Sequence, residues 1–324
     1  MTRTVSVAAG AITTITCASA TNNGTLTSGV AASGASSSVP YTGGNGGTHG
    51  GQTVTSTGVT GLTATLTAGS FVSGAGSLVY NITGTPGSSG TASFALNIGG
   101  QMCTLTRTVA APTVPNICNP SNPTAIVEVT NSTTGKIWMD RNLGANRAAT
   151  SSTDAQSYGS MFQWGRGADG HQCVNRYAGD GVTTSGTTST LSSTDNPGNG
   201  NFILAPSDPY DWRSPQNGSL WQGVSGTNNP CPSGYRLPTE AELAAERASW
   251  SSNGAAGAFA SPLKLPLTGR RGGGGSVFLQ DTYGNYWSST LSEGDPRYLD
   301  LESSDANLYT QFRSLGMSVR CLKN

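Results

Sequence analysis

The sequence predicts two domains, an all-β sandwich followed by a mixed α+β domain. Short runs of alternating apolar and polar residues, bounded by Gly, Ser or Pro turns, predict the sandwich before residue 110. A capped helical segment near residue 240, followed by short strands, predicts the mixed domain. Charge divides the chain at nearly the same place, because residues 1–122 contain Arg3 and Arg107 but no Asp, Glu or Lys. Functions that need carboxylates should therefore lie in the second domain.

Residues 12–110 are expected to form the first domain, and the spacing of its strands suits an immunoglobulin-like sandwich. Strands are predicted where apolar residues alternate, over 61–71, 77–85, 91–99 and 101–109. The glycine-rich stretch 41–52 is predicted to be a long loop, and it lacks the GK[ST] and the helix of a phosphate-binding loop. Residues 111–123 are rich in proline and are predicted to be a linker.

The tetrapeptide Thr-Arg-Thr-Val occurs twice, at residues 2–5 and 106–109, and a cysteine follows each copy. The offset corresponds to about one small β-domain, which indicates an array of repeats. On this interpretation, residues 1–11 are the tail of a preceding repeat. The chain would then be a fragment of a longer secreted protein whose export signal lies upstream.

Residues 124–324 are predicted to form the mixed domain. Its first elements are expected to be a hairpin made from 125–129 and 136–140, and then a helix over 151–165. The next segment, 166–230, is rich in Gly, Asn, Pro and Asp and shows little periodicity. Irregular segments of this length are often functional.

The segment 236–250 gives the clearest helix signal in the chain. Thr239 and Glu242 have the spacing of a capping box, and Leu243 and Trp250 fall on one helical face. Short strands are expected after it, over 262–269, 276–280, 285–290, 297–303 and 317–322.

Composition excludes several classes of partner. The 17 basic and 17 acidic residues balance, so there is no electrostatic case for binding nucleic acid or an anionic membrane. No apolar run is long enough to span a bilayer, and we expect no membrane insertion by this chain. Six cysteines in a Thr/Ser/Gly-rich, Lys-poor chain indicate an oxidising, extracellular setting. Their wide spacing does not favour a zinc site.

Five segments of the second domain form an ordered set of motifs. They are GKIWMDRNLGA (135–145), YGSMFQWGRGADGHQ (158–172), ILAPSDPYDWR (203–213), NPCPSGYRLPTEAE (229–242) and YWSST…SVRC (286–321). Together they resemble the Fibrobacter-type major paralogous domain. That resemblance implies a C-type-lectin-like fold, similar to formylglycine-generating enzymes and to the variable proteins of diversity-generating retroelements. In the first domain, SGTASFALNIGGQMCTLTRTV (89–109) resembles the Ig-like repeats of bacterial surface proteins.

The resemblance implies that the segment after YWSS forms the ligand-facing part of the fold. Framework residues such as Leu299 and Leu301 would keep the scaffold packed, while the residues between them vary. Tyr and Phe supply rigid contact area, and Asn, Asp and Gln supply adaptable hydrogen bonds. The expected ligand-binding residues are Glu293, Asp295, Tyr298, Asp300, Glu302, Asp305, Asn307, Tyr309, Gln311 and Phe312.

The sequence alone does not determine which cysteines pair, because six cysteines allow many combinations. Cys17 and Cys103 lie near the two ends of the first domain, so a bridge between them would join its first and last strands. In the second domain a bridge from Cys231 to Cys321 would tie CPSGYRLP to the last strand. The favoured set is therefore Cys17–Cys103 and Cys231–Cys321, which leaves Cys118 and Cys173 as the remaining pair.

An enzyme is not expected. Formylglycine-generating enzymes use two neighbouring cysteines late in the domain, and only Cys321 stands there. His171 is more simply a hydrogen-bonding loop residue, and no Ser-containing motif of a hydrolase is present. No cofactor is expected either.

A structural calcium ion stays open as an alternative. The loops that carry Asp180, Asp195, Asp208 and Asp211 are rich in carbonyl oxygens, which calcium prefers. The EPN and WND tripeptides of calcium-dependent sugar-binding lectins are absent.

These observations favour a surface adhesin or receptor-binding protein whose C-terminal face binds a protein or a glycan on another cell. The resemblance further suggests a variable protein of a diversity-generating retroelement. Two alternatives stay open, a receptor-binding tip protein of a phage tail and a structural surface-layer protein without a specific ligand.

Overall fold

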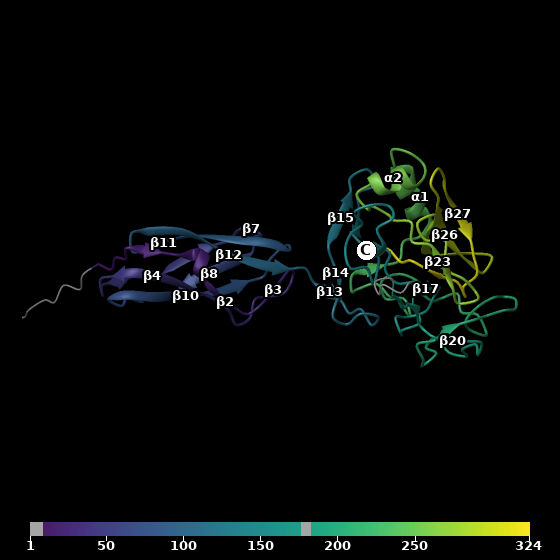
Figure 1. Cartoon of the computed structure of the whole chain (residues 1–324), viewed down its shortest axis with the longest axis horizontal. Helices are drawn as coiled ribbons and strands as arrows, with labels where there is room; N and C mark the ends of the chain where they lie inside the picture. The colour runs from purple at the N-terminus through teal and green to yellow at the C-terminus, as the bar shows by residue number, and fades with distance from the viewer. Residues whose placement is uncertain (1–8, 176–182) are drawn as a thin grey trace, which may run out of the picture. The chain divides into compact units, whose positions relative to one another are not determined.

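The computed structural model describes residues 9–175 and 183–324, and strands dominate it (Figure 1). The chain divides into two compact units, Met1–Pro112 and Thr113–Asn324. Most of the expected linker belongs to the second unit, because β13 (Thr113–Val114) pairs there with β14 (Thr124–Ala125). Among the described residues, no helix is both long and apolar enough to cross a membrane.

The first unit is a β-sandwich, as predicted. One sheet contains β1 (Thr14–Ile15), β2 (Thr21–Asn23), β4 (Ala35–Gly44), β6 (Gln52–Thr55), β8 (Leu62–Leu66) and β10 (Gly74–Gly84). The other contains β3 (Leu26–Thr27), β7 (Thr57–Gly58), β11 (Gly90–Ile98) and β12 (Gln101–Ala110). In the described residues the sheet orders are β1-β4-β10-β8-β6, with β2 on β4, and β3-β12-β11-β7.

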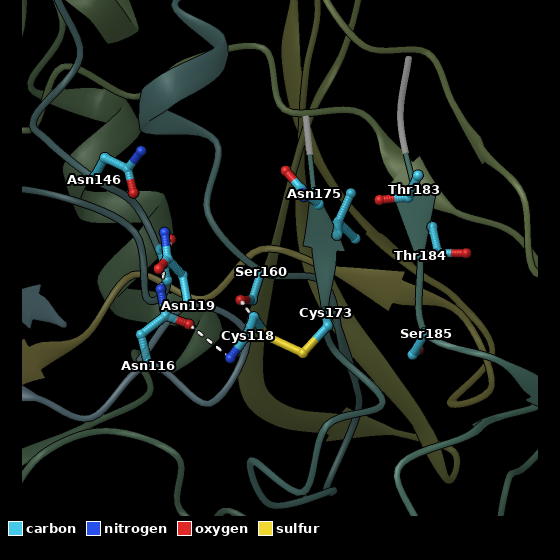
Figure 2. Close-up of a pocket in the computed structure, with 12 residues that line it drawn as sticks. Asn116, Cys118, Asn119, Asn146, Ser160, Cys173, Asn175, Thr183, Thr184 and Ser185 are labelled. Carbon is cyan, nitrogen blue, oxygen red and sulfur yellow. Dashed lines mark hydrogen bonds between the residues drawn. A yellow bond between two sulfur atoms is a disulfide. The ribbon is translucent and has the colours of Figure 1, made fainter. Parts of the chain in front are cut away.

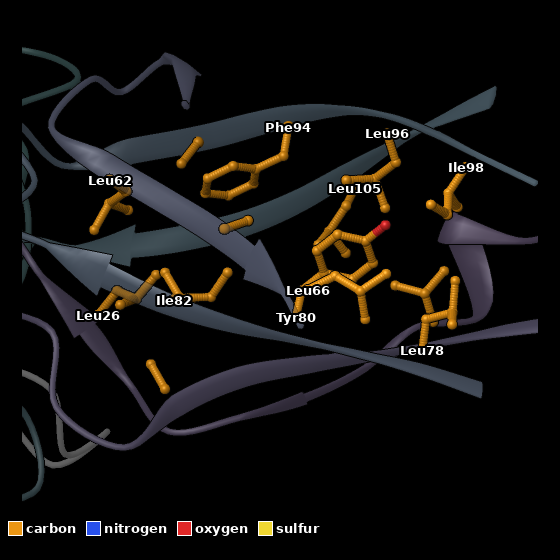
Figure 3. Close-up of a cluster of buried hydrophobic side chains, with 14 of the residues drawn as sticks. Leu26, Leu62, Leu66, Leu78, Tyr80, Ile82, Phe94, Leu96, Ile98 and Leu105 are labelled. Carbon is orange, nitrogen blue, oxygen red and sulfur yellow. The ribbon is translucent and has the colours of Figure 1, made fainter. Parts of the chain in front are cut away.

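The core of this unit lies between the two sheets (Figure 3). Every second residue of β10 and β11 points inward, so Tyr80 and Ile82 meet Phe94 and Leu96 there. Arg107 on β12 is also buried. Its guanidinium donates hydrogen bonds to the carbonyl oxygens of Ser36, Asn23 and Gly24. The arginine of the second Thr-Arg-Thr-Val copy therefore links the two sheets, while Arg3 lies outside the described residues.

The prediction of a long loop over 41–52 is wrong. Strand β4 continues to Gly44, and β5 (Thr48–His49) pairs with β9 (Gly69–Ser70). The glycines are explained by close backbone approach, because a Cβ atom on Gly44 would lie 2.1 Å from the carbonyl oxygen of Val72.

A disulfide joins Cys17 to Cys103, which confirms the expected bridge of the first unit. Replacing both residues with Ala should lower the unfolding free energy of this unit by about 2–4 kcal/mol, since the cross-link restricts the unfolded chain. Calorimetry of the full chain would measure the shift. All tryptophans lie in the second unit, so an unchanged tryptophan transition serves as the internal control. An unmoved transition of the first unit would contradict the expectation.

The second unit contains several small sheets with short helices. One sheet has the order β15 (Glu128–Asn131), β16 (Lys136–Met139), β29 (Leu322–Lys323), β22 (Tyr235–Arg236). Another has the order β17 (Phe162–Gln163), β28 (Gly316–Met317), β23 (Arg270–Arg271), β24 (Val277–Phe278). A third consists of β25 (Gly284–Ser292), β26 (Asp295–Leu301) and β27 (Ala306–Thr310). Smaller pairs join β18 (Val174–Asn175) to β19 (Thr183–Thr184), and β20 (Thr187–Thr188) to β21 (Phe202–Ile203). The predicted opening hairpin is present as β15 and β16.

The predicted capped helix is confirmed as α1 (Glu240–Ala248). The Thr239 hydroxyl accepts from the Glu242 amide, and the Glu242 carboxylate accepts from the Thr239 amide. Leu243 and Trp250 are buried, as their shared face predicts.

The helix predicted over 151–165 is wrong. Only the 3-10 turn Ala155–Ser157 forms there, capped by the Asp154 carboxylate. Gly159 and Gly165 have φ values of 71° and 82°, which an α-helix does not allow. The segment then continues as β17.

The strand predicted over 262–269 is also wrong, although its alternating leucines are buried. These leucines pack in a core together with residues of the short helix α2 (Ala255–Ala260), which the sequence did not predict. Pro262 and Pro266 lack the amide hydrogens that a strand ladder needs.

The long segment after residue 166 is irregular, as expected, and its described part is anchored by buried side chains. Trp212 and Trp221 lie in the core, and the Trp212 indole donates to the carbonyl oxygen of Trp164 at 2.7 Å. Arg166 is fully buried and reaches the carbonyl oxygens of Asn199 and Asn201. The remaining disulfides, Cys118–Cys173 and Cys231–Cys321, confirm the expected pairing.

Candidate functional site

The sheet β25-β26-β27 carries five of the ten expected ligand-binding residues, and the other five lie in the turns between its strands and in the loop after β27. The sheet lies between two cores. Tyr286 and Leu299 contribute to one core, and Trp287 and Tyr298 contribute to the other. Both faces of the sheet are therefore covered over much of their area. The candidate binding surface therefore consists of the edge strand β27, half-buried residues near the two ends of β26, and the loops that follow β25, β26 and β27.

The structure corrects the expectation for Tyr298, which is only 4% exposed. It stands opposite Trp287 and Tyr309 in the strand register, and its ring packs edge-on against Trp287 at 6.0 Å. Burial raises the pKa of its hydroxyl to about 12. The alternation of apolar and polar residues in β26 predicted that Tyr298 faces solvent. In the structure, the core that contains Trp287 covers this face of the strand.

The other expected residues are at least partly exposed. Tyr309 and Phe312 are 48% and 39% exposed, which is unusual for large aromatic side chains. Glu293 and Asp305 are exposed in the turns before and after β26. The remaining residues are half-buried, namely Asp295, Asp300, Glu302, Asn307 and Gln311.

Acidic and amide side chains gather where β26 ends. Asp300 accepts a hydrogen bond from Asn285, and Asn307 donates to Asp305 at 2.5 Å. Burial raises the pKa of Asp300, and the negative charges of Glu302 and Asp305 add to this effect.

Aromatic side chains mark the opposite end of β26. Phe312 lies against Tyr210 with ring centroids 4.4 Å apart, so the two expose a joint apolar surface. Beneath them Arg313 is buried, stacks over Trp164 at 4.8 Å and donates to the Gly294 carbonyl oxygen.

Polar groups from neighbouring elements hold the backbone of β27. Arg247 on α1 donates to the Ala306 carbonyl oxygen at 2.7 Å, and Arg297 on β26 donates to that of Leu308 at 3.1 Å. Beyond the strand, the Gln311 amide donates to the Pro296 carbonyl oxygen. These contacts fix the strand through main-chain atoms.

The sequence reasoning missed three neighbours of this surface: Tyr210, Arg270 and Phe278. Phe278 is 41% exposed, and the Arg270 guanidinium lies 5.2 Å from its ring centroid. Arg270 also bonds to the Tyr298 hydroxyl. These residues come from 208–210 and 270–278, so no local pattern connects them with β27.

A separate cavity of about 440 Å³ lies elsewhere in the second unit (Figure 2). Asn119 and Asn146 lie on one side of it, and Asn175, Thr183 and Thr184 lie on the other. The disulfide between Cys118 and Cys173 lies between the two sides. It shares no described lining residue with the β27 surface.

The aspartates considered for calcium do not gather in one place. Asp195 pairs with Arg213 at 2.8 Å, whereas Asp211 is buried beside Arg313. Asp180 lies outside the described residues, and Asp208 is exposed. Over residues 9–175 and 183–324, no three His, Cys, Asp or Glu side chains form a group that could hold a metal ion.

His171 has a structural environment. Its Nε2 accepts from the Gln163 amide at 3.0 Å, and its Nδ1 lies 2.6 Å from the Asp169 carboxylate. Burial lowers the imidazole pKa to about 4, and the nearby Arg166 and Arg271 charges act in the same direction.

Comparisons with known proteins give no further identification: no family model, no curated protein and no solved structure matches this chain.

Proposed function

We propose that the chain is part of an extracellular surface adhesin or receptor-binding protein, and that the second unit binds a ligand through the β27 surface. This surface is defined by Glu293, Asp295, Asp300, Glu302, Asp305, Asn307, Tyr309, Gln311 and Phe312, with Tyr210 and Phe278 added from the structure. The C-type-lectin-like fold and the retroelement relationship belong to the same proposal.

The main support is a pair of exposed aromatic side chains, Tyr309 on the anchored edge strand β27 and Phe312 in the loop that follows it. Leaving Tyr309 and Phe312 in water is unfavourable unless a partner covers them, because both have large apolar areas. Aromatic residues next to Asn, Asp and Gln side chains are typical of binding surfaces that rely on rigid contact and adaptable hydrogen bonds.

The disulfides agree with an extracellular location, because such bonds persist in oxidising compartments. We interpret the first unit as one repeat module of the same surface protein.

A phage tail tip protein is the alternative with the same binding surface. Neighbouring genes would distinguish the two: a reverse transcriptase with a template repeat supports diversification, and tail genes support a phage.

A double substitution tests the surface directly. The labelled chain would first be screened on protein and glycan arrays, and the ligands found would then be tested with the Tyr309→Ser, Phe312→Ser variant. We expect at least a tenfold loss of affinity, because aromatic anchors often contribute about 2 kcal/mol or more each.

The matched control is Met102→Ser, Leu191→Ser, which removes two other exposed apolar side chains. The control should bind like the wild type, and all three proteins should show the same thermal unfolding. Equal binding by the Tyr309/Phe312 variant would remove the β27 surface as the site. Tyr298 is unsuitable for this test because its replacement would disturb the core.

A further inference from the structure

We propose that the β27 surface binds a basic protein, one that presents lysine or arginine side chains beside an apolar group. This inference rests on the proposed function and adds the chemical class of the ligand. Three features of the surface support it: its charge, a buried amide oxygen without a donor, and the positions of its aromatic side chains.

The carboxylates of the β27 surface are not neutralised within the protein. Eight other carboxylates of the second unit form ion pairs with basic side chains. Arg297, the only basic residue between 293 and 312, pairs with Glu240 on α1. The surface carboxylates that form no ion pair with any described residue are Glu293, Asp295, Asp300, Glu302 and Asp305. Such an excess of negative charge favours a positively charged partner.

At the acidic end of this surface, a buried amide oxygen lacks a donor. Asn285, Asp300 and Asn307 stand opposite one another on three neighbouring strands, so their side chains share one face of the sheet. Asn285 is fully buried, and its Nδ2 donates to Asp300, but its Oδ1 has no hydrogen-bond partner among the described residues. Acceptors therefore predominate in this row. Lysine and arginine side chains carry donors only, so they complement it.

Like charges lie close together at the same end. Burial raises the pKa of Asp300, and the negative charges of Glu302 and Asp305 raise it further. The hydrogen bond from Asn285 and the positive charge of Arg270 act in the opposite direction. A cation supplied by a ligand would reduce the repulsion among the three carboxylates.

An exposed aromatic ring accompanies the carboxylates at each end of the surface. Tyr309 lies on the same face of the sheet as the acceptor row. At the other end Phe312 follows Gln311, whose amide donates to the carbonyl oxygen of Pro296, next to Asp295. Aromatic rings attract lysine and arginine cations and also pack against their alkyl chains.

The distance between the two ends favours a protein over a small cation. Asp295 and Asp300 are five residues apart on β26, which corresponds to roughly 16 Å in an extended strand. A single ammonium group cannot contact both. A neutral glycan could cover the aromatic rings, but it would desolvate the carboxylates without an opposite charge, which is costly.

The test is a titration of the full chain with three labelled heptapeptides, followed by fluorescence anisotropy. The peptides alternate leucine with lysine, serine or glutamate, and each spans roughly 20 Å when extended. We expect the lysine peptide to bind at least tenfold more tightly than the serine peptide, and the glutamate peptide not to bind detectably. Raising NaCl from about 0.05 M to about 0.5 M should weaken the lysine peptide severalfold. Equal binding of the lysine and serine peptides, or no binding of the lysine peptide, would overturn the proposal.

A charge-neutralising variant locates the interaction. Glu293→Gln, Glu302→Gln preserves side-chain size, removes two negative charges and should weaken the lysine peptide at least fivefold. The matched control is Glu128→Gln, Asp140→Asn, which removes two carboxylates that are paired within the protein. Its net charge equals that of the test variant, and it should bind like the wild type. Thermal unfolding verifies that both variants are folded.

The Tyr309→Ser, Phe312→Ser variant separates this inference from the proposed function. Binding that is lost in this variant but unaffected by salt and by Glu293→Gln, Glu302→Gln would overturn the basic ligand and keep the surface. Lysine-peptide binding that is unchanged in the Tyr309/Phe312 variant would remove the surface, and this inference with it. A neutral or acidic glycan as the tightest ligand on the arrays would overturn the basic protein alone.

Discussion

Replacing Arg166 with Met should lower the unfolding free energy of the second unit by about 3–5 kcal/mol. The Arg166 side chain is fully buried, and it donates to Asp169 at 2.8 Å and to Gln163 at 2.9 Å. It also donates to two carbonyl oxygens at 199–201, so it fixes the long irregular segment to the core. Met fills a similar volume but leaves these acceptors, including one carboxylate, without their donor.

Urea unfolding followed by tryptophan fluorescence measures this effect, because every tryptophan lies in the second unit. Lys323→Met is the control, since Lys323 pairs with Glu128 where both side chains are about half exposed. Its loss should cost less than about 1 kcal/mol. A cost for Arg166→Met as small as that of the control would show that the buried network does not stabilise the fold.

The second unit should also lose about 3 kcal/mol of stability as the pH falls from 6.5 to 4. In the unfolded chain His171 binds a proton below about pH 6.5, whereas in the fold its pKa is about 4. Between these values the unfolded state binds more protons, so lowering the pH favours unfolding. Burial is the main cause of the low pKa of His171, and the positive charges of Arg166 and Arg271 lower it further. Asp169, which accepts the Nδ1 proton, offsets part of this effect because its negative charge favours the protonated imidazole.

The comparison of His171→Gln with the wild type isolates this contribution. The variant should be less stable at pH 7, and its stability should change far less between pH 6.5 and 4.5. His49→Gln, in the first unit, should keep the wild-type slope. Restricting the window to pH 4.5 and above limits the contribution of carboxylates such as Asp154 and Glu242, whose folded pKa values are both about 2. Equal slopes in His171→Gln and the wild type would refute the assignment.

The strands and the helix whose sequence signals come from neighbouring residues could be predicted. The alternation of β10, β11 and β12 and the capping box of α1 each depend on residues a few positions apart. The predicted helix at 151–165 failed because Asp154 binds Arg147 and the Thr150 amide, and because Gly159 needs a left-handed backbone. Such contacts between side chains and backbone, and the left-handed conformation of a glycine, do not appear as hydrophobic periodicity.

The candidate site was predictable only in part, for a similar reason. The sequence identified the segment that contains Tyr309 and Phe312, both of which are exposed. It could not show that a second core covers Tyr298, or that Tyr210 packs against Phe312 from a segment about a hundred residues earlier. The cavity lined by Asn119 and Thr183 was missed because its walls meet only in the fold.

The way in which β27 is held has a consequence for evolvability. Arg247 and Arg297 bind carbonyl oxygens of this strand, and every amino acid offers a carbonyl oxygen. A codon change at Tyr309 therefore alters the chemistry of the surface without removing the contacts that set its conformation. Such a strand can acquire new specificities by single mutations at little cost to foldability, whereas Tyr298, whose side chain is part of the core, cannot.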